Sequence, residues 1–363
     1  NNQSNEDEEF EDNSALRLNI RQPLFNWAAF QGKKATATRM EQAQREVDFR
    51  RSELMVETAT RYFDVLSRQA DVEAAEKRHK TVDLQMKRAQ AAYDSGLSPI
   101  TDLQQAESQL DSVRVDSIVA RNARDNNLDL LSRLTGQSHE QLADVKPPYT
   151  VDSPETGQAE QWIQKALANN PALKAKQLAV AAARYDVKTR RGNLYPTLDF
   201  TASIGETEQP VDFGFGNTQL VTDTTSYGLE LNIPIFSGGT ASAQIEEARF
   251  LSLQTEQDEI RTRRLIETET RTTYRNVLAS AARVKALRQA IKSGETSVRA
   301  AKAGLETGTR NILDVLDAEL VLIQRQSELQ KAWYEHAKAG LLLKHIAGEL
   351  RPADLAQVNR ALE

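Results

Sequence analysis

The side chains best placed to do chemistry in this sequence lie just after two breaks in otherwise helical stretches. Asp314 and Asp317 are three residues apart, so on a helix they share one face. Thr101 and Asp102 follow the earlier break in the same way. Carboxylates gathered around one constriction attract cations and repel anions. Acids in the first turn of a helix also stabilise its positive end by about 0.3–1 kcal/mol, and the spacing alone favours this structural role for each of them.

Each break carries a signal for the start of a helix. Ser98 followed by Pro99 is typical of an N-cap residue with proline at the first helical position. At the second break we expect Thr309 or Asn311 to take the capping role. The run Gly304–Gly308 resembles a phosphate-binding loop only in composition, because no strand precedes it, and it is interpreted as a helix-breaking turn.

No catalytic or metal-binding arrangement accompanies these acids. The four histidines are scattered along the chain, and His336 lies on an apolar seam where packing accounts for it. The absence of cysteine excludes disulfides, thiolate metal ligands and cysteine nucleophiles. We therefore expect no enzyme activity, no cofactor and no metal site. The formal net charge of −6 argues against a nucleic-acid-binding protein, which would need a basic face.

Glycine and proline mark out long helices. The chain has 16 glycines and 10 prolines, and neither type occurs in residues 33–95, 100–135 or 240–293. Within these stretches apolar residues recur every three or four positions, as from Met55 to Leu66, which is typical of coiled-coil packing. The first stretch would run about 95 Å as a helix. The sequence therefore predicts long helical hairpins rather than a thick globular core.

Three short segments alternate apolar and polar residues instead, which predicts strands near 15–25, 195–205 and 226–236. Each is about as long as a tilted strand that crosses a bilayer. The sequence contains no run of about 20 apolar residues, so it predicts no membrane-spanning helix. The polar residues 206–226 are interpreted as an exposed loop. A small soluble sheet that caps a helical rod explains the same alternation, so the pattern alone leaves both possibilities open.

The second half of the chain repeats the first. Residues at one constant spacing match between the halves: Tyr62, Val65, Leu66, Gly96, Asp102 and Gly136 match Tyr274, Val277, Leu278, Gly308, Asp314 and Gly348. A spacing that is kept over so long a stretch indicates that one structural unit was duplicated.

The duplication divides the chain into four parts. Residues 1–146 form the first repeat, 147–158 a linker, 159–350 the second repeat and 351–363 a C-terminal segment. The second repeat opens with a helix and a strand that have no counterpart in the first. We therefore expect that the sequence as given lacks an N-terminal helix and strand, which would leave three strands per chain.

Several motifs, in order and partly duplicated, carry a resemblance to a known family over nearly the whole chain. They are Gln22–Phe25, Tyr93–Asp102, Ala168–Leu173, Leu194–Leu198, Leu231–Gly239 and Gly308–Ala318. In these motifs the sequence resembles the TolC-like outer membrane efflux proteins.

The resemblance implies an architecture and a function. It implies a mainly α-helical chain with a small β part, of which three copies form a twelve-stranded transmembrane β-barrel and a helical α-barrel across the periplasm. It implies a passive exit duct in the outer membrane of a Gram-negative bacterium, used in efflux or type I secretion. The implied partners are two further copies of the chain, outer membrane lipid, a periplasmic adaptor (membrane fusion) protein and an inner-membrane pump of the RND, ABC or MFS class.

The resemblance also implies roles for the polar residues at the two breaks. The positions of Asp314 and Asp317 match the family's selectivity filter. Thr101, Asp102 and Arg310 match the links that hold the inner helix pair closed, and Leu305 replaces a tyrosine that usually joins them. The turns that would dock the adaptor consist of Ser95, Gly96, Leu97, Ser98, Thr307, Gly308 and Thr309.

The physics of the strands agrees with a shared barrel. Two to four strands cannot close on themselves, and each unpaired backbone group in lipid costs several kcal/mol. A membrane location therefore requires strands from several chains. The alternative from another class is a soluble coiled-coil scaffold without transport activity, which would not need detergent. Residues 147–158 and 351–363 are expected to form the family's equatorial belt.

Overall fold

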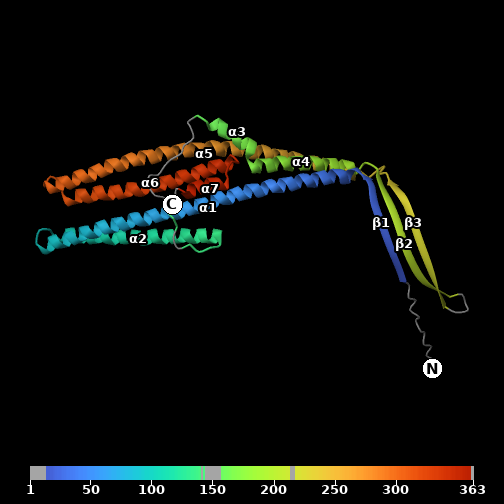
Figure 1. Ribbon diagram of the computed structural model, residues 1–363, viewed down its shortest axis with the longest axis horizontal. Helices are drawn as coiled ribbons and strands as arrows, with labels where there is room; N and C mark the ends of the chain where they lie inside the picture. Colours follow the sequence, from blue (N-terminus) through green and yellow to red (C-terminus); the bar gives the residue numbers. More distant parts are fainter. Residues whose placement is uncertain (1–13, 140–141, 144–156, 213–216, 361–363) are drawn as a thin grey trace, which may run out of the picture. The chain divides into compact units, whose positions relative to one another are not determined.

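The computed structural model describes residues 14–139, 142–143, 157–212 and 217–360 (Figure 1). The elements are β1 (Ser14–Asn26), α1 (Trp27–Asp94), α2 (Ile100–Thr135), α3 (Ala159–Asn169), α4 (Pro171–Gly192), β2 (Thr197–Asp212), β3 (Asn217–Asn232), α5 (Thr240–Glu306), α6 (Ile312–Ile346) and α7 (Pro352–Arg360). The predicted fold class, mainly α with a small antiparallel sheet, is confirmed.

The long helices occupy the stretches that are poor in glycine and proline, and their lengths match in pairs. Helix α1 has 68 residues and α5 has 67, while α2 has 36 and α6 has 35. In Figure 1, α2 lies along the later part of α1, and α6 along the later part of α5. The ion pairs Arg121–Glu76 and Lys302–Glu319 join the partners of each hairpin. No described helix is both long and apolar enough to cross a membrane.

The sheet has the order β1-β2-β3, with both neighbours antiparallel. The register places Leu18 opposite Ile204, and Phe200 opposite Leu229, on one face. The opposite face is polar and carries the ion pair between Arg21 and Asp199 (2.7 Å). The sheet is therefore amphipathic, with an apolar face whose residues on β1 and β3 are exposed in the single chain.

The hairpin of β2 and β3 differs from the expectation. Residues 206–212 and 217–226, expected in an exposed loop, belong to the two strands, because a ladder of paired backbone groups runs out to Asp212 and Asn217. The β-branched side chains at Thr222, Thr224 and Thr225 favour this extended backbone. At its other end β3 stops at Asn232, before the predicted limit near 236. Pro234 has no N–H to donate to a ladder, which accounts for the earlier end.

By its own contacts the chain divides into two compact units, Asn1–Ala43 with Ala175–Ile260, and Gln44–Lys174 with Arg261–Glu363. The first unit holds the sheet and the second holds the helical turns. These units cut across the two sequence repeats, whose boundaries stay a prediction. Most of the predicted 147–158 linker lies outside the described residues, whereas the 351–363 segment contains α7.

The core of the second unit lies where α1, α5 and α6 meet. Phe63 stacks on Tyr334 with ring centroids 5.8 Å apart, and both side chains are buried. Leu355 and Val358 of α7 pack against the same cluster. Helix α7 is held further by an ion pair between Lys344 and Asp354 (2.7 Å).

Two ion pairs at heptad spacing fasten α6 to α1. Lys331 contacts Asp71 (2.6 Å), and one heptad further Lys338 contacts Asp64 (2.9 Å). Residues seven apart lie on the same face of a helix, so the two pairs run along one seam. This seam combines the coiled-coil packing predicted from the sequence with charge pairing that the apolar pattern did not reveal.

Asn170 joins the α3–α4 corner to the end of α6. Its side-chain carbonyl accepts hydrogen bonds from the backbone N–H groups of Ala172 (2.9 Å) and Leu173 (3.1 Å), which caps α4. Its amide donates to the carbonyl oxygen of Ile346 (2.9 Å). The side chain is buried, and these bonds satisfy both its donor and its acceptor ends.

Candidate functional site

The turn between α1 and α2 is closed by its own backbone. Gly96 has φ +71°, a left-handed conformation that favours glycine, and its N–H donates to Tyr93 O (2.8 Å). The next N–H, of Leu97, donates to Ala92 O (2.9 Å). The tip is solvent-facing, since Leu97 is 84% exposed.

The start of α2 differs from the expected cap. The N-cap residue is Pro99, in an extended conformation with no side-chain cap, and the helix begins at Ile100. Ser98 lies one residue too early to cap, and its hydroxyl instead donates to the Asp102 carboxylate (2.7 Å). Thr101 and Asp102 are both exposed in the first turn.

The turn between α5 and α6 repeats this backbone plan with a different cap. Gly308 has φ +74° and donates its N–H to Leu305 O (3.1 Å). Thr307 and Thr309 each donate a hydroxyl to Gly304 O (3.1 Å). Helix α6 begins at Ile312 and its N-cap residue is Asn311, so neither threonine caps it.

Asn311 caps α6 in a reciprocal arrangement with Asp314. The Asn311 side chain accepts from the Asp314 N–H (2.8 Å), and the Asp314 carboxylate accepts from the Asn311 N–H (3.2 Å). This is a capping box, which satisfies two helix-start donors at once. Asp317 lies one turn later, is exposed and has no hydrogen-bond or ion-pair partner among the described residues.

The Arg310 side chain is held by packing, and it makes no hydrogen bond or ion pair among the described residues. A Cβ atom added at Gly304 would lie 3.0 Å from Arg310 Cγ and 3.1 Å from its Cδ, so the arginine stem crosses the bare face of this glycine. The Arg310 side chain is exposed beyond that point. Leu305, at the position of the usual tyrosine, is partly exposed and supplies no hydrogen bond from its side chain.

A single chain does not bring the two sets of gating residues together. Within the described ranges, no hydrogen bond or ion pair joins Arg310 to Thr101 or to Asp102. Each turn keeps its polar contacts to itself. Gly304, predicted to be part of a helix-breaking turn, lies inside the last turn of α5, and its contact with the Arg310 stem could not be predicted from the sequence.

Two of the four histidines, His336 and His345, act as packing residues. His336 is buried and its Nδ1 lies 2.9 Å from Ser280 Oγ. His345 lies 2.9 Å from Ser52 Oγ and against the Phe49 ring, and burial lowers its pKa, with Glu53 opposing the effect. No group of three His, Cys, Asp or Glu side chains in the described part of the chain could hold a metal ion.

A protein-family comparison gives a match that spans both repeats. The family model described as "Outer membrane efflux protein" matches residues 1–137 and 162–349. The two matched segments contain the sheet, all four long helices and both turns.

Individual relatives share about a quarter to a third of their residues with this chain. TolC of Vibrio cholerae is 26% identical over 95% of this chain and 79% of its own length. TolC of Escherichia coli is 30% identical over 85% of this chain and 64% of its own length. The alkaline protease secretion protein AprF of Pseudomonas aeruginosa is 28% identical over 96% of this chain and 72% of its own length.

Solved structures share the fold. CusC, whose structures were described in connection with transmembrane channel formation, matches with a TM-score of 0.77 and 18% identity, over 93% of this chain and 78% of CusC. VceC, an outer membrane protein of Vibrio cholerae, matches with a TM-score of 0.75 and 21% identity, over 93% of this chain and 80% of VceC.

Proposed function

Because this chain belongs to the outer membrane efflux protein family, we propose that three copies of it form one exit duct across the outer membrane, closed at the helix turns. The family establishes the coarser function, an outer membrane channel that substrates leave through. The relatives found are channel and secretion proteins, not enzymes. The duct is passive, so an inner-membrane pump supplies the energy.

The observation that carries the proposal is the amphipathic sheet. Its apolar face is exposed on β1 and β3, where Leu18 and Leu229 lie more than half in solvent. Strands β1 and β3 form its two edges among the described residues, and each leaves backbone groups without a partner. In lipid such edges are costly unless other strands pair with them. Identical copies supply these strands, with the apolar face toward lipid and the polar face, with Arg21 and Asp199, toward the lumen.

The turns would close the duct at its periplasmic end. Three copies around an axis would place three Asp314 and three Asp317 carboxylates at one constriction, which attracts cations and repels anions. Asp317 is free to face this opening. Thr101 and Asp102 would link to Arg310 across neighbouring helix pairs, since no such bond forms within one chain. Leu305 contributes no hydrogen bond to this closed state.

The exposed turns would also dock a periplasmic adaptor. Ser95–Ser98 and Thr307–Thr309 carry exposed backbone and hydroxyl groups, and Leu97 offers an apolar side chain to a partner. The adaptor would connect the duct to a pump of the RND, ABC or MFS class. The relative named for alkaline protease secretion supports a type I secretion role, and the family's description as outer membrane efflux proteins supports an efflux role.

Purification of the full-length protein with and without detergent tests the proposal. We expect detergent-dependent solubility, a particle of three protomer masses by native mass spectrometry, and discrete conductance steps in planar bilayers. A coiled-coil scaffold would instead purify from buffer alone and give no conductance. A monomer in buffer without channel activity would overturn the duct.

A further inference from the structure

The junction between the sheet and the helices of the first unit is strongly basic. The cations are Lys33 and Lys34 on α1, and Lys188, Arg190 and Arg191 on α4. All five side chains are exposed. We call these five residues the basic collar. Residues 27–38, 187–196 and 233–245, which make up the junction, contain no aspartate or glutamate.

Close packing between α1 and α4 brings these cations to one level. A Cβ atom added at Gly192 would lie 2.7 Å from Ala28 Cα, so the two helices meet almost backbone to backbone there. One turn further along, a Cβ at Gly32 would lie 4.0 Å from Thr189 Cγ2. Trp27 and Tyr195 face each other with ring centroids 6.2 Å apart. The cations of both helices therefore line the same narrow zone.

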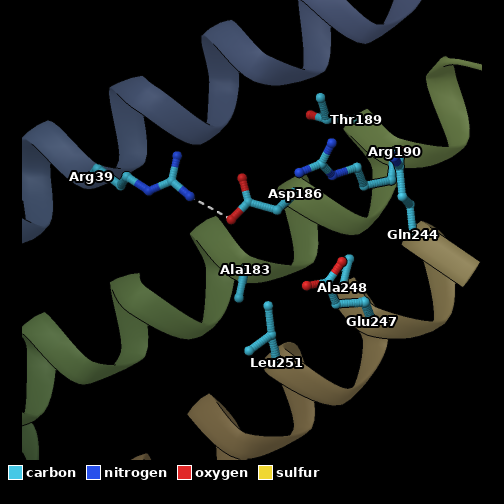
Figure 2. A pocket seen from close by; sticks show the side chains of 9 residues that line it. All are labelled: Arg39, Ala183, Asp186, Thr189, Arg190, Gln244, Glu247, Ala248 and Leu251. Carbon is cyan, nitrogen blue, oxygen red and sulfur yellow. Dashed lines mark hydrogen bonds and ion pairs between the residues drawn. The ribbon is translucent and has the colours of Figure 1, made fainter.

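The nearest acids do not neutralise the collar. Asp186 pairs with Arg39, and Figure 2 shows this bond in a pocket where Arg190 lies without a bond to Asp186. Glu247 of α5 lines the same pocket. Ion pairs elsewhere in this unit join Arg21 to Asp199, Arg184 to Glu256, and Arg249 to Glu246. None of them includes a collar residue.

The collar continues an apolar surface in the order that a membrane boundary requires. Beyond the exposed apolar face of the sheet come exposed aromatic side chains, Trp27, Tyr195 and Phe236, and then the cations. Aromatic rings favour the boundary between hydrocarbon and headgroups. Lys33 lies six residues beyond Trp27, about 9 Å along α1, which is comparable to the thickness of a headgroup layer. Long basic side chains can extend along an apolar surface so that their charged ends reach the headgroup layer.

The far end of the sheet has the opposite charge. Glu206 and Asp223 are directly paired across β2 and β3, and Glu208 accepts a hydrogen bond from the Ser14 hydroxyl. The two ends of the sheet are therefore electrostatically different. Among the described residues, the positive charge that attracts a phosphate-bearing surface lies at the end that joins the helices.

We propose that the basic collar binds the phosphate groups of anionic phospholipids in the periplasmic leaflet of the outer membrane. This inference rests on the proposed function, which places the sheet in the membrane and the helices in the periplasm. Arginine contacts a phosphate through two parallel N–H donors, and lysine adds a point charge. Basic residues that follow a membrane segment gain affinity for anionic lipid in this way. The collar would fix the depth of the duct and enrich anionic lipid around it.

Fluorescence of Trp27 reports directly on this zone. The chain has three tryptophans, and the other two, Trp162 and Trp333, pack in the cores of the second unit. We would reconstitute the full-length protein in bilayers that mix phosphatidylethanolamine with phosphatidylglycerol, with one lipid brominated at a time. Quenching gives the relative affinity of each lipid for the site beside Trp27. We expect phosphatidylglycerol to be favoured at least threefold.

A five-site variant tests the assignment to the collar. Changing Lys33, Lys34, Lys188, Arg190 and Arg191 to glutamine should reduce the preference to about one. The matched control changes five exposed cations of the second unit to glutamine and should keep the parental preference. These control residues are Lys77, Lys80, Lys285, Arg288 and Lys292.

The outcomes separate the two proposals. If neither brominated lipid quenches Trp27, the sheet does not lie in the membrane and the duct itself fails. Equal quenching by both lipids, or a preference that the collar variant keeps, overturns the collar alone. Inorganic phosphate should reduce the preference no more than sodium chloride of equal ionic strength, and a stronger effect would indicate a site for free phosphate instead of lipid.

Discussion

Asn311 and Asp314 exchange two hydrogen bonds at the start of α6, each side chain accepting from the other residue's backbone N–H, at 2.8 and 3.2 Å. One of the two carboxylates proposed for the selectivity filter therefore also holds the helix end in place. Asp317 has no such task and is exposed. Asp314 therefore serves both as a cap and as a charge, whereas Asp317 can contribute a charge alone.

This division predicts different effects of removing each acid. Asp317→Ala should weaken block of the channel by a trivalent cation about tenfold, equivalent to about 1.4 kcal/mol, because it removes a charge and no cap. Asp314→Ala should weaken block and also destabilise the first turn of α6 by about 1 kcal/mol. Titration of single-channel current measures the block, and amide hydrogen exchange of residues 312–315 measures the cap.

The matched control for the filter is Asp129→Ala, which removes an exposed acid from α2 at a distance from both turns. It should leave block and exchange unchanged. Parental block in the Asp314 and Asp317 double variant would remove the filter assignment.

Neutralising the proposed latch should open the channel. Asp102→Asn and Arg310→Gln should each raise the single-channel conductance severalfold, because each removes one partner of a charge-assisted link between helix pairs. Asp111→Asn and Arg114→Gln, both on exposed positions of α2, are the controls. Conductance at the parental value in both latch variants would contradict the role.

Two glycines related by the repeat should respond differently to alanine. Gly136 and Gly348 both have φ +69°, a left-handed conformation that costs about 1–2 kcal/mol for alanine. A Cβ at Gly136 meets nothing within 4 Å, whereas at Gly348 it would lie 2.6 Å from the Asn169 carbonyl oxygen. Gly348→Ala should therefore lower the free energy of unfolding by a further 1–3 kcal/mol or so. Thermal unfolding of both variants in one detergent measures the difference. Equal losses of stability would show that the α3–α4 corner moves to make room for the added methyl group.

The seam between α1 and α6 should depend on Asp64. The Lys338 side chain is 16% exposed; burial alone lowers its pKa, but hydrogen bonds to Glu335 and Asp64 outweigh this and raise it, so the ammonium stays charged. Asp64→Asn should cost about 1.5–3 kcal/mol, because a partly buried cation loses its partner on α1. The control Asp83→Asn removes a surface pair with Lys87 and should cost well under 1 kcal/mol. Chemical denaturation measures the free energy of unfolding of both variants. Equal losses would show that the ion pair between α1 and α6 stabilises the protein no more than a surface pair does.

His345 should make the second unit sensitive to mild acid. Burial holds its pKa below the ordinary 6.5, so the folded state binds fewer protons there than the unfolded state as the pH falls. Its contribution to stability is complete above 6.5 and declines as the pH falls below that value toward the lowered pKa. Unfolding temperatures at about pH 7.5 and about pH 5.5 should differ less in His345→Gln than in the parent. An unchanged difference would mean that other groups carry the acid sensitivity.

The fold could be predicted from sequence wherever one periodic signal ran uninterrupted. Gly136 and Gly348 end helices as their type suggests, and the stretches without glycine or proline are helical. The β2–β3 hairpin was underestimated because its outer residues are polar, and polarity was taken for a loop. Pairing between strands, which depends on two segments at once, carries the ladder out to Asp212 and Asn217.

The turns show a second kind of limit. Ser98 and Asn311 both suit an N-cap by residue type, yet only Asn311 directly precedes its helix, in an extended conformation that lets its side chain reach the helix start. One residue of offset sends the Ser98 hydroxyl to Asp102 instead. Capping depends on where the helix begins, and the composition of a turn does not fix that to one residue.

By itself, the sequence determined the periodic properties of this protein: long helices, an amphipathic sheet, a duplicated plan and acids after each break. These follow from residue type and spacing along one chain. The tertiary structure decided which distant residues meet: Gly192 against Ala28, Lys338 beside Asp64, Gly348 under Asn169. Such contacts depend on the bare backbone of a glycine or the reach of a side chain at one crossing point, and no local pattern encodes where two segments cross.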